Sequence, residues 1–486
     1  MTSVQEYKVK IGLEIHCQLT NLKTKLFCGC SADYRRDPPN SHLCPVCSGQ
    51  PGSLPVANER AVEDATMVAL ALGSRIESLN YFYRKNYFYP DMPKNFQISQ
   101  YDKAGAVPFA FEGVVKTKLG GSYKDVTITR IQIEEDPGKL SYLGTIDTSP
   151  HSLVDYNRAG VTLLEIVTDP VLESPQEARL FLQKLRSILE HLNVSDGGLE
   201  GAMRCDANIS LAGGKRVEVK NISSFKEVER ALAFEVSRQK SLIAKGRTVQ
   251  LETRHWDEVR RVTISLRAKE EEHDYRYFPE ADLPPILLSQ EYVERVRTKM
   301  PELPDARSAR FIGEYGLPEY DADVLTSDKD LADFFEDCLK LYDKPKEASN
   351  WIMTDLLRWL HEENIEISEA RISPQNLVDM LKLIDDGTIS GKIGKTVLRE
   401  MMKTGRGAVD IVNERGLVRI SSEEQIEAAV EKVFEENLQA VSDAQSDEKA
   451  VHFLVGQVMR LTKGKADPMT TNKIVKLRLA KRTGKS

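Results

Sequence analysis

The sequence predicts an α+β protein in which a large sheet domain precedes two helical regions. Segments in which apolar and polar residues alternate, as in strands, are confined to the chain before about residue 286. Beyond that point amphipathic helices follow one another, and a stretch rich in lysine and arginine comes last. We therefore expect a sheet domain over residues 1–292, a helical domain over 293–405 and a small helical tail domain over 406–486.

The composition is that of an ordinary globular protein, with 486 residues, 41% hydrophobic and 29% charged. No apolar run approaches the roughly 20 residues that a membrane helix needs. The first residues, MTSVQEYKVK, contain neither an apolar signal core nor an arginine-rich transit segment. We expect a cytoplasmic protein that does not enter a membrane.

The first strand-like segment is KVKIGLEIHCQ, Lys8 to Gln18. Its alternation puts Val9, Ile11, Leu13 and Ile15 on one face, and Glu14 and His16 on the other. A carboxylate and an imidazole two residues apart suit metal binding or proton transfer. A solvated strand face would show the same pattern, so both interpretations stay open.

Four of the seven cysteines are clustered in a short loop, 28–47. They form a C-x-C pair and a C-P-V-C pair, and they are Cys28, Cys30, Cys44 and Cys47. Disulfides are rare in the cytosol, whereas four clustered thiols are typical of a tetrahedral zinc site. A site with four cysteines has no open position, so we expect a structural Zn²⁺ rather than a catalytic one. Chance clustering is the alternative.

Aromatic and cationic residues alternate from Tyr81 to Tyr101, where Arg84, Lys85 and Lys94 lie among tyrosines and phenylalanines. Such a stretch suits a purine base beside phosphates, or an RNA strand. An apolar core with lysines that reach out to water is the other interpretation.

The segment LVDYNRAGVTLLEIVTDP, residues 153–170, places a single acid, Glu165, within an apolar run. A buried carboxylate without a partner costs several kcal/mol, so it should be paired or bound to a metal. Acids recur in this way on other strand-like segments, at Glu14, at Glu134 or Glu135, at Asp206 and at Glu218. Alternation puts Glu134 and Glu135 on opposite faces and does not decide between them. Because acids on one sheet repel each other, we expect Mg²⁺ and nucleotide phosphates to accompany them on a catalytic surface.

Charge is unevenly distributed along the chain. The net charge is −7, yet residues 457–486 contain nine lysines and arginines against one acid, Asp467. Such a basic stretch attracts phosphate backbones. A solvated tail that only aids solubility is the alternative.

Nine segments, in this order, resemble the B-subunit family of aspartyl/glutamyl-tRNA amidotransferases, which convert Asp-tRNA(Asn) or Glu-tRNA(Gln) to the amide. They are IGLEIHCQL, RKNYFYPDMPKNFQISQYD, RIQIEEDPGK, VDYNRAGVTLLEIVTDP, MRCDANIS, VEVKNISSFK, LETRHWDE, DYRYFPEADLPP and FLVGQVMRLTKGKADP. The resemblance implies a cradle domain with a mixed or antiparallel sheet, then a helical domain and a YqeY-like tail domain that holds tRNA.

The resemblance also implies a set of site residues. One Mg²⁺ would be held by His16, Glu135 and Glu165, and a second by Glu14, Glu135, Asp206 and Glu218. The family motif favours Glu135 over Glu134. Weaker candidates for contacts to phosphate or substrate are Lys85, Arg158 and Lys220. Zinc is implied at the four clustered cysteines.

The reaction that the resemblance implies begins with phosphoryl transfer from ATP to the side-chain carboxylate of the tRNA-bound Asp or Glu. Ammonia then displaces phosphate from the acyl phosphate. The chain has no Ser-Ser-Lys amidase signature, so ammonia should come from a partner. The resemblance implies that this partner is the glutaminase A subunit, with a small C subunit joining the two.

Two other functions are compatible with parts of the pattern. A carboxylate–amine ligase acting on a free amino acid would have a similar acid-lined sheet, but it does not account for the basic tail. A non-catalytic zinc-containing tRNA-binding adaptor would leave the strand acids unexplained.

Overall fold

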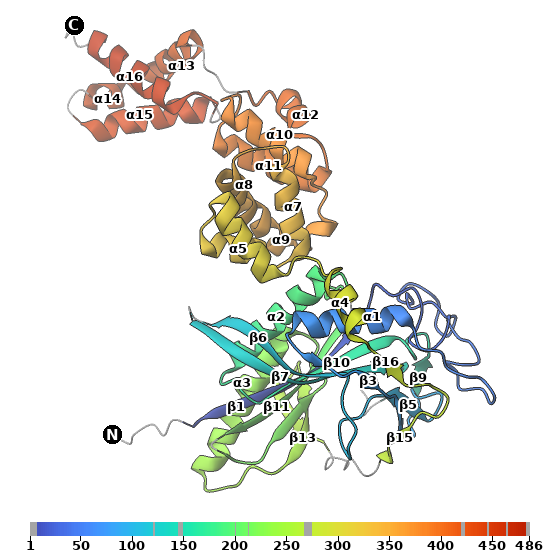
Figure 1. Cartoon of the computed structure of the whole chain (residues 1–486). Coiled ribbons are helices and arrows are strands. Elements are labelled where there is room, and N and C mark those ends of the chain that lie inside the picture. Colours follow the sequence, from blue (N-terminus) through green and yellow to red (C-terminus); the bar gives the residue numbers. More distant parts are fainter. Residues whose placement is uncertain are drawn as a thin grey trace. The chain divides into compact units, whose positions relative to one another are not determined.

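The computed structural model describes residues 7–119, 122–143, 149–199, 201–211, 213–266, 275–418, 423–444, 447–462 and 465–482. The chain divides into two compact units, Met1–Ala306 and Arg307–Ser486 (Figure 1). The first unit is built on a sheet, and the described residues of the second contain helices but no strand. The predicted α+β class is therefore confirmed. The finer boundaries at 292 and 405 stay predictions.

A nine-stranded sheet forms the centre of the first unit. Neighbouring strands are antiparallel except β12 and β13, which are parallel, so the sheet is mixed. From edge to edge the order is β14 (Val262–Ser265), β13 (Glu252–Asp257), β12 (Val217–Lys220), β11 (Met203–Leu211), β1 (Val9–Gln18), β10 (Thr162–Thr168), β7 (Ser122–Glu135), β6 (Ala110–Leu119) and β2 (Arg75–Ile76).

One face of this sheet is apolar because the register aligns apolar residues across the strands. Ile15 of β1 lies opposite Ile166 of β10, which lies opposite Ile131 of β7. Three helices contribute to the same core: α1 (Glu59–Ala71), α2 (Pro175–His191) and α3 (Phe225–Ala244). Each fully buried aliphatic or aromatic side chain stabilises the fold by about 1.5–3 kcal/mol. The opposite face of β1, β10 and β7 is left for polar side chains.

Three smaller sheets complete the first unit. They are β15 (Phe278–Pro279) with β4 (Tyr83–Asn86) and β5 (Phe96–Ser99), β16 (Ile286–Leu287) with β3 (Leu79–Asn80), and β8 (Lys139–Tyr142) with β9 (Ser152–Asp155). Ser99 of β5 donates a hydrogen bond of 3.1 Å to the carboxylate of Glu134 on β7. The aromatic stretch of the sequence therefore lies beside the polar face of the large sheet.

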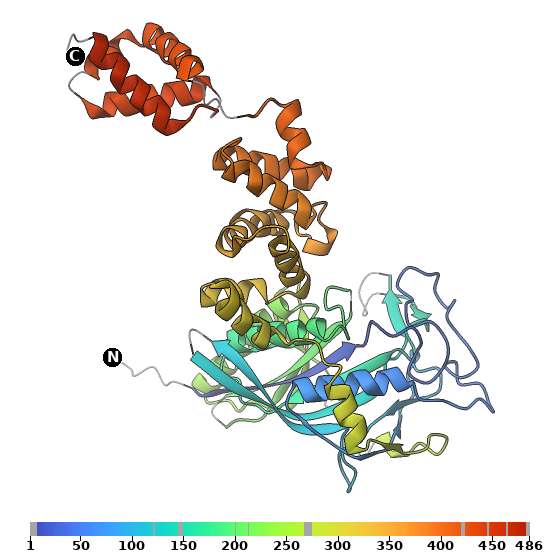
Figure 2. The ribbon, with the colours of Figure 1, turned by 45° about the horizontal axis from the view of Figure 1, so that its top comes forward.

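Helix α1 begins and ends where its sequence indicates. The side chain of Asn58 accepts hydrogen bonds from the backbone of Arg60 and Ala61, and Gly73 follows the helix with a φ of 64°. Helix α4 (Gln290–Arg297) packs on α1, as Figure 2 shows, and Lys299 forms an ion pair of 2.6 Å with Glu63.

Asp64 of α1 is fully buried, and burial raises the pKa of its carboxyl to about 6, although Asn21 and Arg60 favour the charged form. The folded state therefore holds this proton more tightly than the unfolded state, so stability falls as pH rises from about 4 to about 6. We expect the free energy of unfolding of Asp64→Asn, relative to that of the wild type, to rise by about 1 kcal/mol between pH 5 and pH 7.5.

Urea unfolding at both pH values tests this, followed by the fluorescence of Trp256 in a Trp351→Phe, Trp359→Phe background. Taking the difference between variant and parent at each pH removes the effect of other titrating groups. A difference that does not change between pH 5 and pH 7.5 would contradict the assignment.

The second unit contains two separate apolar cores. One is formed by buried residues between 311 and 412, and the other by buried residues between 426 and 479. Its helices are α5 (Pro304–Tyr315), which spans the boundary, α6 (Glu319–Leu325), α7 (Lys329–Leu339), α8 (Pro345–Trp351), η2 (Ile352–Leu356), α9 (Leu357–Glu363), η3 (Ile367–Glu369), α10 (Pro374–Asp385), α11 (Gly391–Thr404), α12 (Ala408–Glu414), α13 (Glu423–Glu436), α14 (Leu438–Asp443), α15 (Glu448–Leu461) and α16 (Pro468–Arg482).

The basic tail is partly neutralised within its own helical group. Arg478 of α16 forms ion pairs with Glu427 and Glu431 of α13, and Arg482 pairs with Glu431 as well. Lys463 and Lys485, two of the predicted basic residues, lie outside the described residues. In the part of the chain that the structure describes, no helix is both long and apolar enough to cross a membrane.

Candidate active site

The polar face of the large sheet brings together acids from five strands, β1, β7, β10, β11 and β12. Glu14 of β1 lies opposite Asp206 of β11, and His16 of β1 lies opposite Glu165 of β10. Glu218 of β12 follows on the next strand, opposite Asn208 of β11. Residues directly opposite each other in neighbouring strands share a face of the sheet. The predicted acidic surface is therefore present as a geometric feature.

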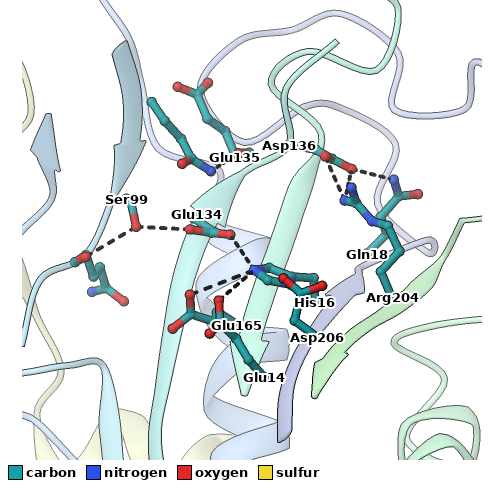
Figure 3. A network of polar contacts seen from close by, with 12 residues as sticks. Glu14, His16, Gln18, Ser99, Glu134, Glu135, Asp136, Glu165, Arg204 and Asp206 are labelled. Atoms are coloured by element: carbon teal, nitrogen blue, oxygen red, sulfur yellow. Dashed lines mark hydrogen bonds and ion pairs between the residues drawn. The ribbon is translucent and has the colours of Figure 1, made fainter. Parts of the chain in front are cut away.

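Three carboxylates surround the imidazole of His16 (Figure 3). Its Nε2 lies 3.5 Å from Glu134, 3.8 Å from Glu165 and 3.9 Å from Glu14. Mg²⁺ ligands sit about 2.1 Å from the ion, so octahedral neighbours lie about 3.0 Å apart and opposite ligands about 4.2 Å apart. The spacing around His16 falls in that range. Glu14, His16 and Glu165 also offer ligand atoms that all lie within 4.8 Å of one another.

Glu165 is a buried acid of this cluster. Only 8% of it is exposed, and burial raises the pKa of its carboxyl, as do the negative charges of Glu134 and Glu14. Arg130 opposes this effect through contacts of 3.1 and 3.0 Å from its Nε and Nη2 to a Glu165 oxygen. Arg130 and the nearby Lys85 supply two positive charges against three carboxylates, so the cluster is suited to additional positive charge.

Glu134, and not Glu135, lies beside His16, which corrects the position expected from the family motif. On β7, Glu134 shares the face of Arg130 and Gln132, whereas Glu135 follows Ile131 and Ile133 on the other face.

Glu135 instead lines a separate cavity of about 170 Å³. Its carboxylate accepts hydrogen bonds from Lys94 Nζ at 2.5 Å and from the backbone of Ile98 at 2.8 Å. In Figure 3 it is directed away from His16. The same small cavity borders Cys28 and Cys47.

Lys220 joins the remaining two acids of the face. Its ammonium lies 2.6 Å from Asp206 and 3.7 Å from Glu218, and Thr253 donates a hydrogen bond of 2.9 Å to Glu218. Although burial opposes the charged form, these two carboxylates raise the pKa of Lys220 above its usual range. The lysine is therefore a fixed cation on the acidic face.

Lys85 reaches the same face from β4. It lines a cavity of about 450 Å³ together with Glu14, Glu165 and Glu218. Burial disfavours its charged form, but the charges of Glu134 and Glu165, together with Tyr87 and Tyr275, raise the pKa of Lys85. Arg158, the third predicted contact residue, lies elsewhere, because its guanidinium donates to the backbone carbonyls of Pro137 and Gly138 at 2.9 and 2.7 Å.

The four clustered cysteines converge as predicted. Cys47 Sγ lies 3.9 Å from Cys30 Sγ and 3.8 Å from Cys44 Sγ, and all four sulfurs lie within 4.8 Å of one another. Four sulfurs bound tetrahedrally to Zn²⁺ at about 2.3 Å would be about 3.8 Å apart. The ligand set and its spacing therefore fit zinc.

A lysine that no pattern in the sequence indicates accompanies the cysteines. Lys25 is fully buried, and its ammonium donates to the carbonyl of His42 at 2.9 Å and lies 3.8 Å from Cys47 Sγ. A hydrogen bond with Cys28 and the charge of Lys25 hold the pKa of the Cys47 thiol well below its usual range, against the effect of burial. A buried cation here offsets the negative charge of thiolates.

Comparison with known families agrees with this geometry. The model of the GatB/GatE catalytic domain family matches residues 9–294, and that of the GatB domain family matches residues 333–479. The B subunit of an aspartyl/glutamyl-tRNA(Asn/Gln) amidotransferase from Thermotoga maritima is 52% identical over 478 residues, covering 96% of this chain and 98% of the relative. The chain belongs to the B-subunit family of these amidotransferases.

Other relatives in the B-subunit family come from distant organisms. Proteins of the same description from Sulfurisphaera tokodaii and Carboxydothermus hydrogenoformans are 50% and 48% identical, and they cover 96% and 98% of this chain. The resemblance drawn from the nine sequence segments is thus confirmed along nearly the whole length.

One polar network of this GatB-family chain has no clear counterpart among the sequence predictions. Asp136 has a fully buried side chain, and it accepts hydrogen bonds from Gln18 at 2.7 Å and from Arg204 at 2.7 and 2.8 Å (Figure 3). It therefore ties the end of β7 to β1 and β11, next to the acidic face. The only signal in the sequence was its place as the third acid after Glu134 and Glu135.

Proposed function

We propose that this chain transfers the γ-phosphoryl group of ATP to the side-chain carboxylate of a misacylated tRNA, Glu-tRNA(Gln) or Asp-tRNA(Asn). It then promotes attack by ammonia on the acyl phosphate. The observation that carries this proposal is the cluster of three carboxylates around His16 on the sheet of a GatB-family catalytic domain. Carboxylates of this density suit a site that handles phosphates together with divalent cations.

The proposed ligands of one Mg²⁺ are His16, Glu14, Glu134 and Glu165, with Glu134 in the place first expected for Glu135. Asp206 and Glu218 are the proposed acids of a second position, where Lys220 already supplies one charge. Bound divalent cations would supply electrostatic stabilisation of the charge that develops on the transferred phosphoryl group.

The cations of the face have the role of positioning. Lys85 of β4 and Lys220 of β12 line the same cavity as the acids. We assign them to contacts with phosphate oxygens or with the carboxylate that accepts the phosphoryl group. Arg158 is not part of this proposal, because the backbone carbonyls of residues 137 and 138 already bind its guanidinium.

The second part of the proposal is a zinc ion bound by the four cysteines. The ion would stabilise the loop that borders the Glu135 cavity. The chain would act in the cytoplasm, where thiols stay reduced. We expect one zinc per chain by elemental analysis and a loss of more than about half of it in Cys44→Ser.

Cys338→Ser is the matched control for the zinc measurement, because Cys338 is buried in the second unit, and it should retain the ion. Equal zinc content in both variants would exclude the four-cysteine site.

The remaining components follow from the family. Relatives are named as subunits, and we propose that ammonia reaches this chain from a glutaminase A subunit held in place by a small C subunit. The helices of the second unit would hold the tRNA. Within the described part of the tail, Lys465 and Lys481 contribute positive charge, and the exposed Lys473 and Lys476 lie 3.8 and 3.7 Å from Glu423 and Glu448.

The test is ADP release by the reconstituted three-subunit complex with Mg²⁺ and ATP. Glu-tRNA(Gln), Asp-tRNA(Asn), correctly charged Glu-tRNA(Glu) and free glutamate are compared. Turnover only with a misacylated tRNA would support the proposal and would identify the tRNA served. Equal turnover with free glutamate would favour a ligase acting on a free amino acid. If tRNA binds but ADP is not released with any substrate, the remaining interpretation is a non-catalytic zinc-containing tRNA-binding adaptor.

A further inference from the structure

A continuous row of tyrosine rings lies beside the acidic face. Tyr101 and Tyr277 are stacked, with ring centroids 4.4 Å apart and planes inclined by 17°. Tyr83 extends the row at 5.7 Å from Tyr101, and Tyr275 continues it at 6.2 Å from Tyr277. Tyr87 ends the row at 6.0 Å from Tyr275. Tyr83 lies on β4, Tyr87 directly follows β4 and Tyr101 follows β5, whereas Tyr275 and Tyr277 come from the segment before β15, which is distant in sequence.

The row and the acids border one cavity. Tyr101, Tyr275 and Tyr277 line the cavity of about 450 Å³ whose other side holds Glu14 and Glu165. A cavity of this volume lies within the range of about 300–1,000 Å³ that is usual for sites of small-molecule ligands.

Lys85 lies where the two sides meet. Its ammonium is 5.1 Å from the centre of the Tyr275 ring and 5.8 Å from that of Tyr87. On the other side, the carboxylates of Glu134 and Glu165 are the nearby acids whose charge raises its pKa. An aromatic surface thus continues, through one cation, into a surface suited to phosphate.

We propose that Tyr101, Tyr275 and Tyr277 form a stacking surface for an adenine base whose phosphate or ester end reaches the acidic face. This rests on the proposed function and deepens it. Aromatic side chains bind bases through their ring faces, and a cation beside them suits the adjoining phosphate. A row that served packing alone would not need to line the same cavity as the acids.

The adenine has two possible sources with the same chemistry. One is ATP, and the other is the 3′-terminal adenosine of the tRNA, which carries the amino acid to be modified. In ATP the adenine belongs to the nucleotide that donates the phosphoryl group, and in tRNA it belongs to the nucleotide that carries the amino acid. The experiment therefore has to distinguish these two sources.

The experiment uses the full three-subunit complex and two pairs of probes, the members of which differ by the presence of one adenosine. The first pair is ATP and tripolyphosphate, each with Mg²⁺. The second is deacylated tRNA with and without its 3′-terminal adenosine. Kd values are measured for the wild type, Tyr277→Leu and Tyr277→Phe. Tyr123→Leu is the control, since Tyr123 is 62% exposed and lies on β7 away from this cavity.

For ATP as the source, Tyr277→Leu should raise the Kd for ATP about tenfold and leave that for tripolyphosphate unchanged. If the terminal adenosine is the source, Tyr277→Leu should raise the Kd only for the tRNA that carries this adenosine. Tyr277→Phe should restore affinity in either case, because it keeps the ring face. Leucine retains apolar packing, so a general loss of structure is not expected, and thermal unfolding checks this.

The proposal is overturned if Tyr277→Leu changes no Kd, or if it weakens both members of a pair equally. It is also overturned if the wild type itself does not distinguish the members of either pair. Failure of the proposed function would appear differently, as absence of ADP release by the wild type with misacylated tRNA, while these binding ratios would still be measured.

Discussion

Glu134→Gln is expected to lower tRNA-dependent ADP release by about 100-fold or more while the fold is retained. Glutamine preserves the shape of the side chain and its hydrogen bond with Ser99, but it removes the charge that faces His16 at 3.5 Å. A ligand that loses its charge holds a divalent cation less tightly. The dependence of the rate on Mg²⁺ concentration should therefore shift to higher values, which a purely structural role would not cause.

Glu135→Gln is the matched control, one residue along the same strand. Its carboxylate belongs to the other cavity, where Lys94 and the backbone of Ile98 bind it. With ammonia supplied directly, we expect ADP release within about tenfold of the wild type and an unchanged Mg²⁺ dependence. The opposite outcome, with Glu135→Gln inactive and Glu134→Gln active, would return the ligand role to Glu135.

Asp136→Ala is expected to destabilise the first unit by about 3 kcal/mol, the largest stability effect that a single side chain of the site should show. Removal of this fully buried carboxylate leaves the guanidinium of Arg204 without this acceptor and leaves the amide of Gln18 with its longer hydrogen bond of 3.3 Å to the hydroxyl of Tyr34. The exposed fraction of the Arg204 side chain, 36%, lets water compensate part of the loss.

Native-state hydrogen exchange of the amides in β1, β7 and β11 measures this loss within the first unit. The double variant Asp136→Ala, Arg204→Leu serves as the control, because removal of both charges should cost less than the sum of the two single changes. Additive losses would show that the two side chains do not act as a pair.

Much of the acidic face could be predicted from the sequence because strand alternation is a local property. The period of two placed Glu14 and His16 on one face of β1, and it placed Glu134 with Arg130 and Gln132. Whether Glu134 or Glu135 meets His16 depends on the register of β10 with β7, where Glu165 lies opposite Gln132. That register joins residues more than 30 positions apart, and alternation within one strand does not contain it.

Other parts of the site depend on long-range contacts. The cysteine spacing predicted the cluster, but nothing near Lys25 indicated that its ammonium would be buried beside Cys47. Asp136 meets Arg204, 68 residues further along the chain. Arg158 was a weaker candidate for contacts to phosphate or substrate, and only the folded loop shows that backbone carbonyls at residues 137 and 138 accept hydrogen bonds from it.

The most direct test of the central claim follows an oxygen atom. Misacylated tRNA whose side-chain carboxylate carries ¹⁸O at both oxygens is incubated with the complex, ATP, Mg²⁺ and ammonia, and the inorganic phosphate released is analysed by mass spectrometry. Phosphoryl transfer to the carboxylate, followed by displacement with ammonia, moves one ¹⁸O into phosphate for each amide formed. We expect this stoichiometry in the wild type, and its loss together with amide formation in Glu134→Gln. Amide formation with no ¹⁸O in the phosphate would contradict an acyl phosphate made on this chain.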